Sequence, residues 1–135
     1  MVFFILVGCG HKSEKVNNKN DAFGEYFYKG LEAGDNGELE IAIDCFTKCI
    51  NLKLNNKKRL SNAYYNLGNI LIEADKKIEA LDNFKKAIEL NPHFASAYKN
   101  MGVLKEQLGM PFCYDFRKCC ELGHKGCCIY FENDC

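Results

Sequence analysis

Apolar and small side chains recur at helical spacing in the middle of the chain, between residues 61 and 94. On a first helix they share one face at positions i, i+3, i+4 and i+7, namely Tyr64, Leu67, Gly68 and Leu71. On a second helix they are Ala80, Phe84 and Ala87, and Asn91-Pro92 ends that helix. Gly68 and Ala80 leave room for the partner helix, and Tyr64 and Phe84 fill the space beside them. The pattern therefore predicts two packed helices.

Weaker copies of this pattern flank the central unit. Residues 23–56 place Tyr26, Gly30, Ala42 and Phe46 at matching positions, and residues 95–122 do so with Tyr98 and Gly102. Gly109 and Pro111 separate the two helices of the third unit, although Tyr114 stands where Ala80 leads us to expect alanine. Gly123 and Gly126 bound a turn before a short terminal helix, 127–134. We expect an all-α solenoid of about three helix–turn–helix units within a domain at 22–135.

The spacing from Tyr64 through Gly68, Ala80 and Phe84 to Pro92 resembles the tetratricopeptide (TPR) repeat, whose period is about 34 residues. The resemblance implies a non-enzymatic scaffold that binds a peptide or protein partner. By the family's register, the binding groove would contain Phe27 and Leu31 in the first repeat and Asn62, Tyr65, Asn69, Ile72, Ser96, Lys99 and Val103 in the other two. Some TPR proteins hold a C-terminal carboxylate in a Lys/Asn/Arg clamp. Phe27 and Leu31 occupy the Lys and Asn positions, so we expect no such clamp.

The first nine residues, MVFFILVGC, form an apolar run that ends in Leu6-Val7-Gly8-Cys9. This resembles the lipobox of bacterial lipoproteins, in which the peptide is cut before the cysteine and the thiol receives a lipid. We read residues 1–9 as a signal remnant and Cys9 as the lipidation site. A basic segment is missing before the apolar run, so we expect the start site to lie upstream of Met1. The alternative is a buried N-terminal element.

Residues 10–21 are polar and poor in apolar side chains, which predicts a flexible tether between anchor and domain. In the lipoprotein family an Asp directly after the cysteine can retain the protein at the inner membrane. Gly10 occupies this position, so the resemblance implies a location at the outer membrane, facing the periplasm.

Six of the nine cysteines lie at the C-terminal end, in the stretch 113–135. In an antiparallel hairpin, facing positions share one sum of residue numbers. Cys113 with Cys135 and Cys120 with Cys128 share the same sum, which predicts two disulfides along one seam. Cys119 and Cys127, one step round each helix, are either a third bridge or two thiols. The stretch around Cys120 and Cys128 also resembles the cysteine-rich Sel1-like repeats of secreted bacterial proteins, in which a comparable pair bridges adjacent helices.

The balance of charges and the spacing of the cysteines limit the classes of function. Eighteen basic and eighteen acidic side chains cancel, so nothing indicates a nucleic-acid partner. Zinc sites favour two cysteines separated by two to four residues, and only Cys45 and Cys49 have that spacing, where packing as small core residues is the simpler reading. We therefore expect no metal, no cofactor and no catalytic site. Two alternatives stay open: a secreted Sel1-like protein in host or envelope interaction, and a small metal- or thiol-handling protein in which His124 serves as a ligand.

Overall fold

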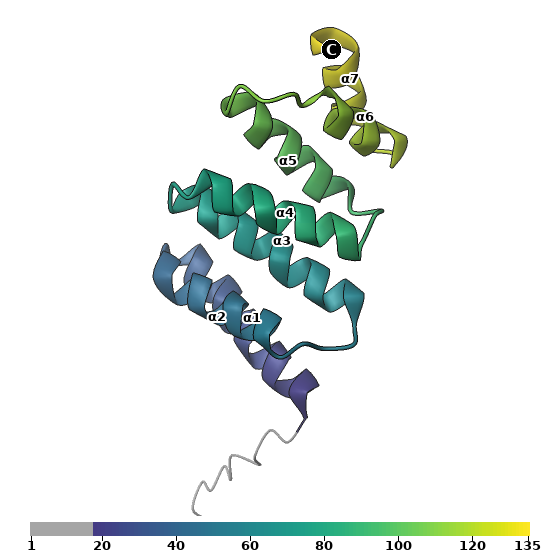
Figure 1. The fold of residues 1–135 in the computed structure, drawn as a ribbon. Helices are drawn as coiled ribbons and strands as arrows, with labels where there is room; N and C mark the ends of the chain where they lie inside the picture. The colour runs from purple at the N-terminus through teal and green to yellow at the C-terminus, as the bar shows by residue number, and fades with distance from the viewer. Residues whose placement is uncertain (1–17) are drawn as a thin grey trace, which may run out of the picture.

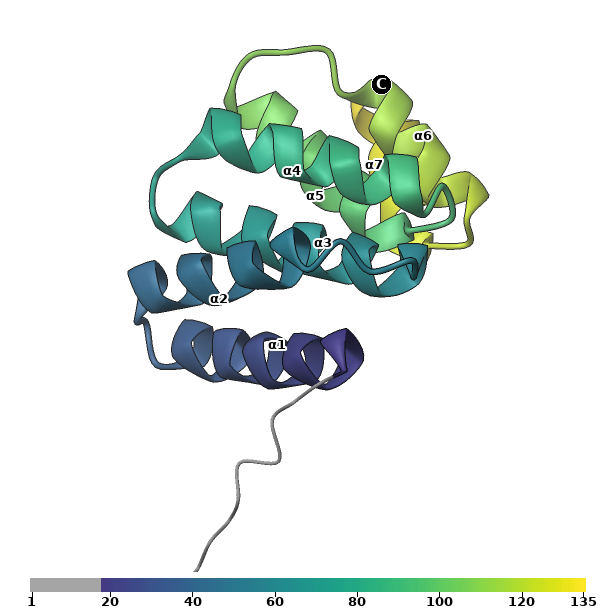
Figure 2. The same ribbon diagram turned by 60° about the horizontal axis from the view of Figure 1, so that its bottom comes forward.

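The computed structural model describes residues 18–135, which form an all-helical solenoid (Figure 1). Its helices are α1 (Lys19–Asp35), α2 (Leu39–Asn51), α3 (Lys57–Glu73), α4 (Lys77–Leu90), α5 (Ala95–Gln107), α6 (Cys113–Glu121) and α7 (Lys125–Asp134). Three hairpins, α1–α2, α3–α4 and α5–α6, stack one on the next, and α7 closes the C-terminal end (Figures 1 and 2). This is the predicted fold class. The signal remnant 1–9, including Cys9, and most of the tether lie outside the described residues.

Three helices begin earlier than the sequence pattern predicts, because a side chain caps each of them. The Asn56 side chain accepts a hydrogen bond from the Arg59 backbone N–H, so α3 starts at Lys57 instead of residue 61. The Asn18 side chain accepts a hydrogen bond from the Asn20 backbone N–H, so α1 starts inside the predicted tether of residues 10–21. The His124 Nδ1 atom accepts from the Cys127 backbone N–H, so α7 starts at Lys125 instead of residue 127. A capping acceptor satisfies one of the free N–H groups of a first turn and thereby fixes where the helix begins.

A glycine packed against a phenylalanine ring recurs in every hairpin. A Cβ atom added to Gly68 would lie 2.8 Å from the Phe84 ring, and one added to Gly30 would lie 3.0 Å from Phe46. Phe46 and Phe84 are almost fully buried, as are Ala42 and Ala80. The small residues therefore let the two helices of a hairpin approach closely, which is the packing that the sequence pattern predicts.

The third hairpin keeps this contact but shifts its register. Gly102 packs against Phe116, which lies 14 residues further on, whereas Phe84 lies 16 residues after Gly68. The simple 34-residue offset is therefore wrong for α6, and Tyr114 does not take the place of Ala80. Tyr114 is instead 54% exposed. The chain from the turn to the packed ring is two residues shorter in the third hairpin, since Phe116 lies 7 residues after Gly109 whereas Phe84 lies 9 residues after Asp75.

The same turn conformation links the two helices of each hairpin. Gly37, Asp75 and Gly109 have φ angles of +75°, +58° and +66°. Glycine adopts this left-handed conformation without a steric penalty, and aspartate is one of the few other residues that tolerate it. These three positions are therefore structurally equivalent.

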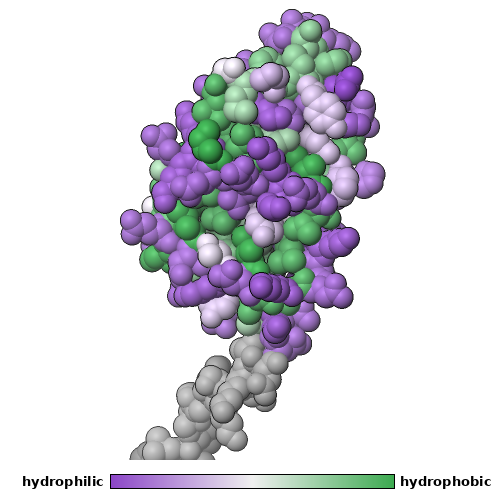
Figure 3. All heavy atoms as spheres, viewed as in Figure 1, coloured by the Kyte–Doolittle hydropathy of each residue, from purple (hydrophilic) through white to green (hydrophobic). Residues whose placement is uncertain are grey.

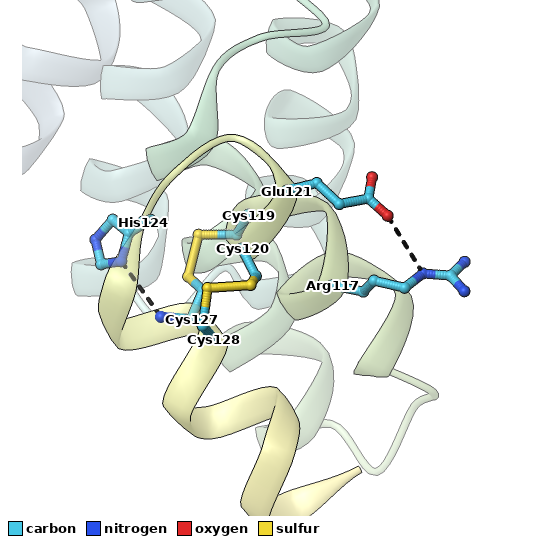
Figure 4. Close-up of a disulfide and its surroundings, with 7 residues drawn as sticks. All are labelled: Arg117, Cys119, Cys120, Glu121, His124, Cys127 and Cys128. Carbon is cyan, nitrogen blue, oxygen red and sulfur yellow. Dashed lines mark hydrogen bonds and ion pairs between the residues drawn. A yellow bond between two sulfur atoms is a disulfide. The ribbon is translucent and has the colours of Figure 1, made fainter.

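Three disulfides connect α6 to α7: Cys113–Cys135, Cys119–Cys127 and Cys120–Cys128. The first and third are the pairs that the constant-sum argument predicts, and the second is the pair that the sequence leaves open. The Cys119–Cys127 and Cys120–Cys128 bridges lie side by side near the turn between the two helices (Figure 4). Cys119 and Cys120, which are adjacent on α6, therefore pair with Cys127 and Cys128, which are adjacent on α7.

Aromatic packing joins α7 to the rest of the domain. The Tyr130 ring stacks on the Phe116 ring with 4.2 Å between centroids, and the Tyr130 hydroxyl donates a hydrogen bond to Glu106. The hydrogen bond to the Glu106 carboxylate raises the pKa of Tyr130 to about 12, and burial contributes in the same direction. Ile129, on the outer side of α7, is 60% exposed.

A buried ion pair also holds α5 to α6. The Lys105 Nζ atom lies 2.7 Å from an Asp115 carboxylate oxygen, and the Asp115 side chain is fully buried. Its other oxygen, Oδ1, has no hydrogen-bond partner within residues 18–135. Burial raises the pKa of Asp115, against the opposing effect of Lys105. The pair fixes α6 against α5 at the position where the third hairpin departs from the repeat register.

Candidate peptide-binding groove

The first helices of the three hairpins, α1, α3 and α5, lie next to one another and form a polar and aromatic surface. On α3, side chains spaced i, i+3, i+7, i+10 and i+14 form a stripe along the edge that faces α1, namely Arg59, Asn62, Asn66, Asn69 and Glu73. We call the surface between α1 and α3 the α1–α3 seam. A helical stripe of this kind places side chains from one end of a helix to the other on a single line.

Two hollows follow one another along the α1–α3 seam. The first has a volume of about 150 Å³ and is lined by Phe23, Gly24, Phe27, Tyr28, Arg59 and Asn62. The second has a volume of about 200 Å³ and is lined by Gly30, Leu31, Gly34, Asp35, Phe46, Asn66, Asn69, Ile70 and Glu73. Phe27 and Leu31, which the TPR register assigns to the groove, thus provide apolar surface in the two hollows.

Side-chain amides give the middle of this surface its hydrogen-bonding character. The Asn100 Nδ2 atom on α5 donates to the Asn69 Oδ1 atom at 2.8 Å and to the Tyr65 hydroxyl at 3.2 Å. The Asn66 amide donates to the Asn62 backbone carbonyl at 2.8 Å. These bonds hold the amides in place, and each amide keeps donor or acceptor capacity that it does not use within residues 18–135. An extended peptide backbone offers the complementary donors and acceptors.

Not every residue that the TPR register assigns to the groove is equally available. Asn62 and Asn69 line the two hollows, and Ser96, Lys99 and Val103 are exposed on α5. Tyr65 is half-buried, with its ring 4.7 Å from Phe94 between centroids. Ile72 is also half-buried and packs against the hydrophobic core, so it contributes support more than contact surface.

Several groove residues are absent from the sequence-based set. Arg59 precedes the TPR repeat register, which begins at residue 61, yet α3 begins at Lys57 and carries Arg59 beside α1. The Arg59 Nη1 atom donates to Asn20 Oδ1 at 3.1 Å, and its guanidinium lies 5.0 Å from the centre of the Phe23 ring. The polar stripe spacing on α3 is the signal that would have found Arg59, Asn66 and Glu73.

Cys119, His124 and Cys127 carry side chains of the kinds that bind metal ions. Ligand atoms of Cys119, His124 and Cys127 lie within 4.8 Å of one another. Both sulfur atoms are joined in a disulfide, however, and metal ligation requires thiolates. The His124 ring caps α7 (Figure 4). These residues therefore act as parts of the α6–α7 connection in this structure.

Cys45 and Cys49 are unpaired and buried in the hydrophobic core. Burial, together with the neighbouring Cys45, raises the pKa of Cys49 to about 12. A thiol with such a pKa stays protonated near neutral pH and is a poor nucleophile. The two residues fill space between α1 and α2, as the sequence predicts for small core side chains.

Comparison with known proteins identifies the fold of this surface. Profiles described as tetratricopeptide repeat match residues 19–56 and 61–94, which together make up more than half of the chain. The chain belongs to the tetratricopeptide repeat family. The TPR fold is a protein-interaction scaffold, which agrees with a groove made of amides and hollows.

Two curated relatives illustrate how widely this TPR segment is used. The chain is 28% identical over 107 residues to the photosystem I assembly protein Ycf3 of Synechococcus sp. (strain CC9605), which covers 79% of this chain and 61% of Ycf3. It is 39% identical over 84 residues to UDP-N-acetylglucosamine–peptide N-acetylglucosaminyltransferase of Giardia intestinalis, covering 61% of this chain but 5% of the transferase. The chain thus spans less than two thirds of these relatives.

Solved structures share the arrangement of the helices. The TPR domain of Arabidopsis OM64 superposes with a TM-score of 0.74 at 20% identity, covering 87% of this chain and all of that domain. The second TPR domain of human RPAP3, in complex with an HSP70 peptide, superposes with a TM-score of 0.74 at 20% identity, covering 85% and 96%. At this identity the likeness shows the fold alone.

Figure 3 shows one face of the molecule. There, hydrophobic side chains lie in patches separated by hydrophilic ones. A larger hollow of about 540 Å³ lies at the turns after α1 and α3, near Glu38, Ile41 and Lys76. None of the residues that line this hollow belongs to the polar stripe of α3. Among the described residues, none of the helices has the length and apolarity needed to cross a bilayer.

Proposed function

We propose that this TPR protein is a non-enzymatic scaffold that binds an extended peptide segment of a protein partner along the α1, α3 and α5 surface. The observation that carries the proposal is the amide row Asn62, Asn66 and Asn69, which lines an apolar hollow at one end and a polar hollow at the other. Amides recognise a peptide backbone, while the hollows receive side chains. Peptide complexes of TPR domains with the same helix arrangement support this function.

We further propose that the protein is a lipoprotein anchored through Cys9 and placed at the outer membrane, facing the periplasm. The lipobox-like Leu6-Val7-Gly8-Cys9 supports the anchor, and Gly10 after the cysteine supports the outer membrane. Three disulfides support an oxidising compartment, and the Sel1-like cysteine spacing is consistent with export. A tethered scaffold would hold its partner at the membrane surface.

The anchor is tested by changing Cys9 to Ser. We expect the wild-type protein to sediment with membranes and to carry an acylated mature N-terminus, because at least two acyl chains give durable anchoring. The Cys9→Ser variant should appear in the soluble periplasmic fraction. Mass spectrometry of the N-terminal peptide provides the measurement. A soluble wild-type protein without acyl mass would refute the lipoprotein assignment.

The groove is tested with two matched asparagines. The Asn66 and Asn83 side chains both donate to the carbonyl four residues earlier, at 2.8 Å and 2.9 Å. Asn66 lines the α1–α3 seam, whereas Asn83 lies on α4. Asn66→Arg should abolish cross-linking of the partner in membrane extracts, while Asn83→Arg should leave it intact. Equal cross-linking by both variants, with equal thermal stability, would place the binding surface elsewhere.

A further inference from the structure

Gly24 is the glycine of α1 that packing does not explain. A Cβ atom at Gly30 would lie 3.0 Å from the Phe46 ring, and one at Gly34 would lie 2.8 Å from Ile70. At Gly24 such an atom would meet no other atom of residues 18–135 within 4 Å. A glycine inside a helix is less favourable than alanine, and it is commonly retained where another molecule approaches the backbone. Gly24 therefore indicates a place where a ligand comes close to α1.

The open space above Gly24 is the first hollow of the α1–α3 seam. Phe23 and Phe27 supply apolar walls, and Tyr28 is 73% exposed at its edge. The hollow has the size and character to receive one apolar side chain of a bound segment. Arg59 stands at the same hollow and is the charged residue among those that line it. Its contacts with Asn20 and Phe23 fix the guanidinium but leave donors of its five N–H groups available.

The charge reverses along the α1–α3 seam. The second hollow is lined by the carboxylates Asp35 and Glu73, both of which are exposed. Arg59 and Glu73 are separated by 14 positions on α3, which at 1.5 Å per residue corresponds to about 21 Å. An extended peptide covers this distance in about six residues. The amides of Asn62, Asn66 and Asn69 lie between the two ends.

We propose that the groove recognises an extended segment of about seven residues with opposite charges at its two ends. The acidic end of the segment pairs with Arg59, an apolar side chain next to it enters the hollow at Gly24, and the basic end lies at Asp35 and Glu73. This inference rests on the proposed function and specifies the chemistry of the partner. Opposite end charges also set the direction in which the segment lies.

The test uses capped octapeptides with a central stretch of alanine and serine and a leucine next to one end. Three peptides are compared by the residues at their two ends, which are Glu and Lys, Glu and Glu, or Lys and Lys. Each peptide is made with its sequence in both directions. Fluorescence anisotropy with the full chain at low salt measures the affinities. We expect the Glu/Lys pattern to bind roughly threefold more tightly than either like-charged pattern, since exposed charge pairs contribute modestly. The preference should disappear at about 1 M salt, where the Debye length is ~3 Å.

Two pairs of variants assign the effect to the seam. Gly24→Leu should fill the first hollow and weaken all peptides at least about tenfold, because it places a side chain where the ligand leucine would sit. Its thermal stability should not fall, since the space is open. Thr47→Leu adds the same side chain at an exposed position of α2 and should change nothing. Glu73→Lys should shift the preference toward the Glu/Glu peptide, whereas Glu79→Lys on α4 should not.

Several outcomes would overturn the inference. They are equal binding of the three end patterns, no measurable binding of any peptide, or wild-type affinity in Gly24→Leu. If Asn66→Arg still abolishes cross-linking of the partner, the scaffold function stands and only the charge pattern falls. If Asn66→Arg has no effect either, the groove itself is the wrong surface.

Discussion

Replacement of Phe84 by alanine should destabilise the protein by about 3–5 kcal/mol, the range for loss of a large buried aromatic side chain. Phe84 is fully buried and fills the space beside Gly68, so the variant leaves a cavity between α3 and α4. The central hairpin contacts both of its neighbours, so its loss should be felt throughout the solenoid. Urea unfolding followed by circular dichroism measures the free energy of unfolding.

The matched control for Phe84 is Ile78, on the same helix but 62% exposed. Ile78→Ala should change the free energy of unfolding by no more than about half a kcal/mol, as is usual for surface positions. Similar small losses in Phe84→Ala and Ile78→Ala would show that α4 does not pack on α3 through this residue. The same comparison at Phe46 would test whether the first hairpin uses the same packing.

Reduction of the disulfides should release α7 and lower stability by several kcal/mol, since each bridge typically contributes about 2–4 kcal/mol. A helix of 10 residues is too short to be stable alone in water. The aromatic contact of Tyr130 with Phe116 would then remain without covalent support, which is too little to keep so short a helix in place. Amide hydrogen exchange should show rapid exchange in residues 125–134 after reduction, and slow exchange in the oxidised protein.

Peptide mapping without reductant separates the three bridges. We expect alkylation only at Cys45 and Cys49 among the described cysteines, and only after unfolding, because both are buried thiols. The double variant Cys113→Ser/Cys135→Ser should free the end of α7 and leave its start fixed by the two bridges near the turn. Alkylation of native Cys113 and Cys135 in protein isolated without reductant would contradict the disulfide assignment.

The α6–α7 connection shows how far sequence reasoning reaches. Constant index sums find Cys113–Cys135 and Cys120–Cys128 because an antiparallel hairpin fixes which positions face each other. They do not decide whether Cys119 and Cys127 join, since that depends on how the two helices are rotated about their axes. The structure brings both adjacent pairs together, and rotation of this kind is set by packing of α6 and α7 on α5.

The groove shows a similar division. The TPR register predicts Asn62 and Asn69 as groove residues because the repeat determines which side of α3 does not pack against its partner helix, α4. Arg59 lies before the repeat begins, and only the extra first turn of α3 brings it to Phe23 and Asn20. Gly24 resembles the other glycines of α1 in the sequence, and its open surroundings become visible only in the structure.

The sequence by itself determines the helices, their pairing into hairpins and the turns between them. These features depend on spacings of three, four and about 34 residues, such as Gly68 with Phe84, and on local turn chemistry at Gly37, Asp75 and Gly109. The tertiary structure decides the register of α6, where Phe116 rather than residue 118 meets Gly102, and the composition of the α1–α3 seam. The α1–α3 seam joins side chains about 40 positions apart, such as Arg59 and Asn20. Whether such side chains meet depends on how whole hairpins stack, which a local pattern does not encode.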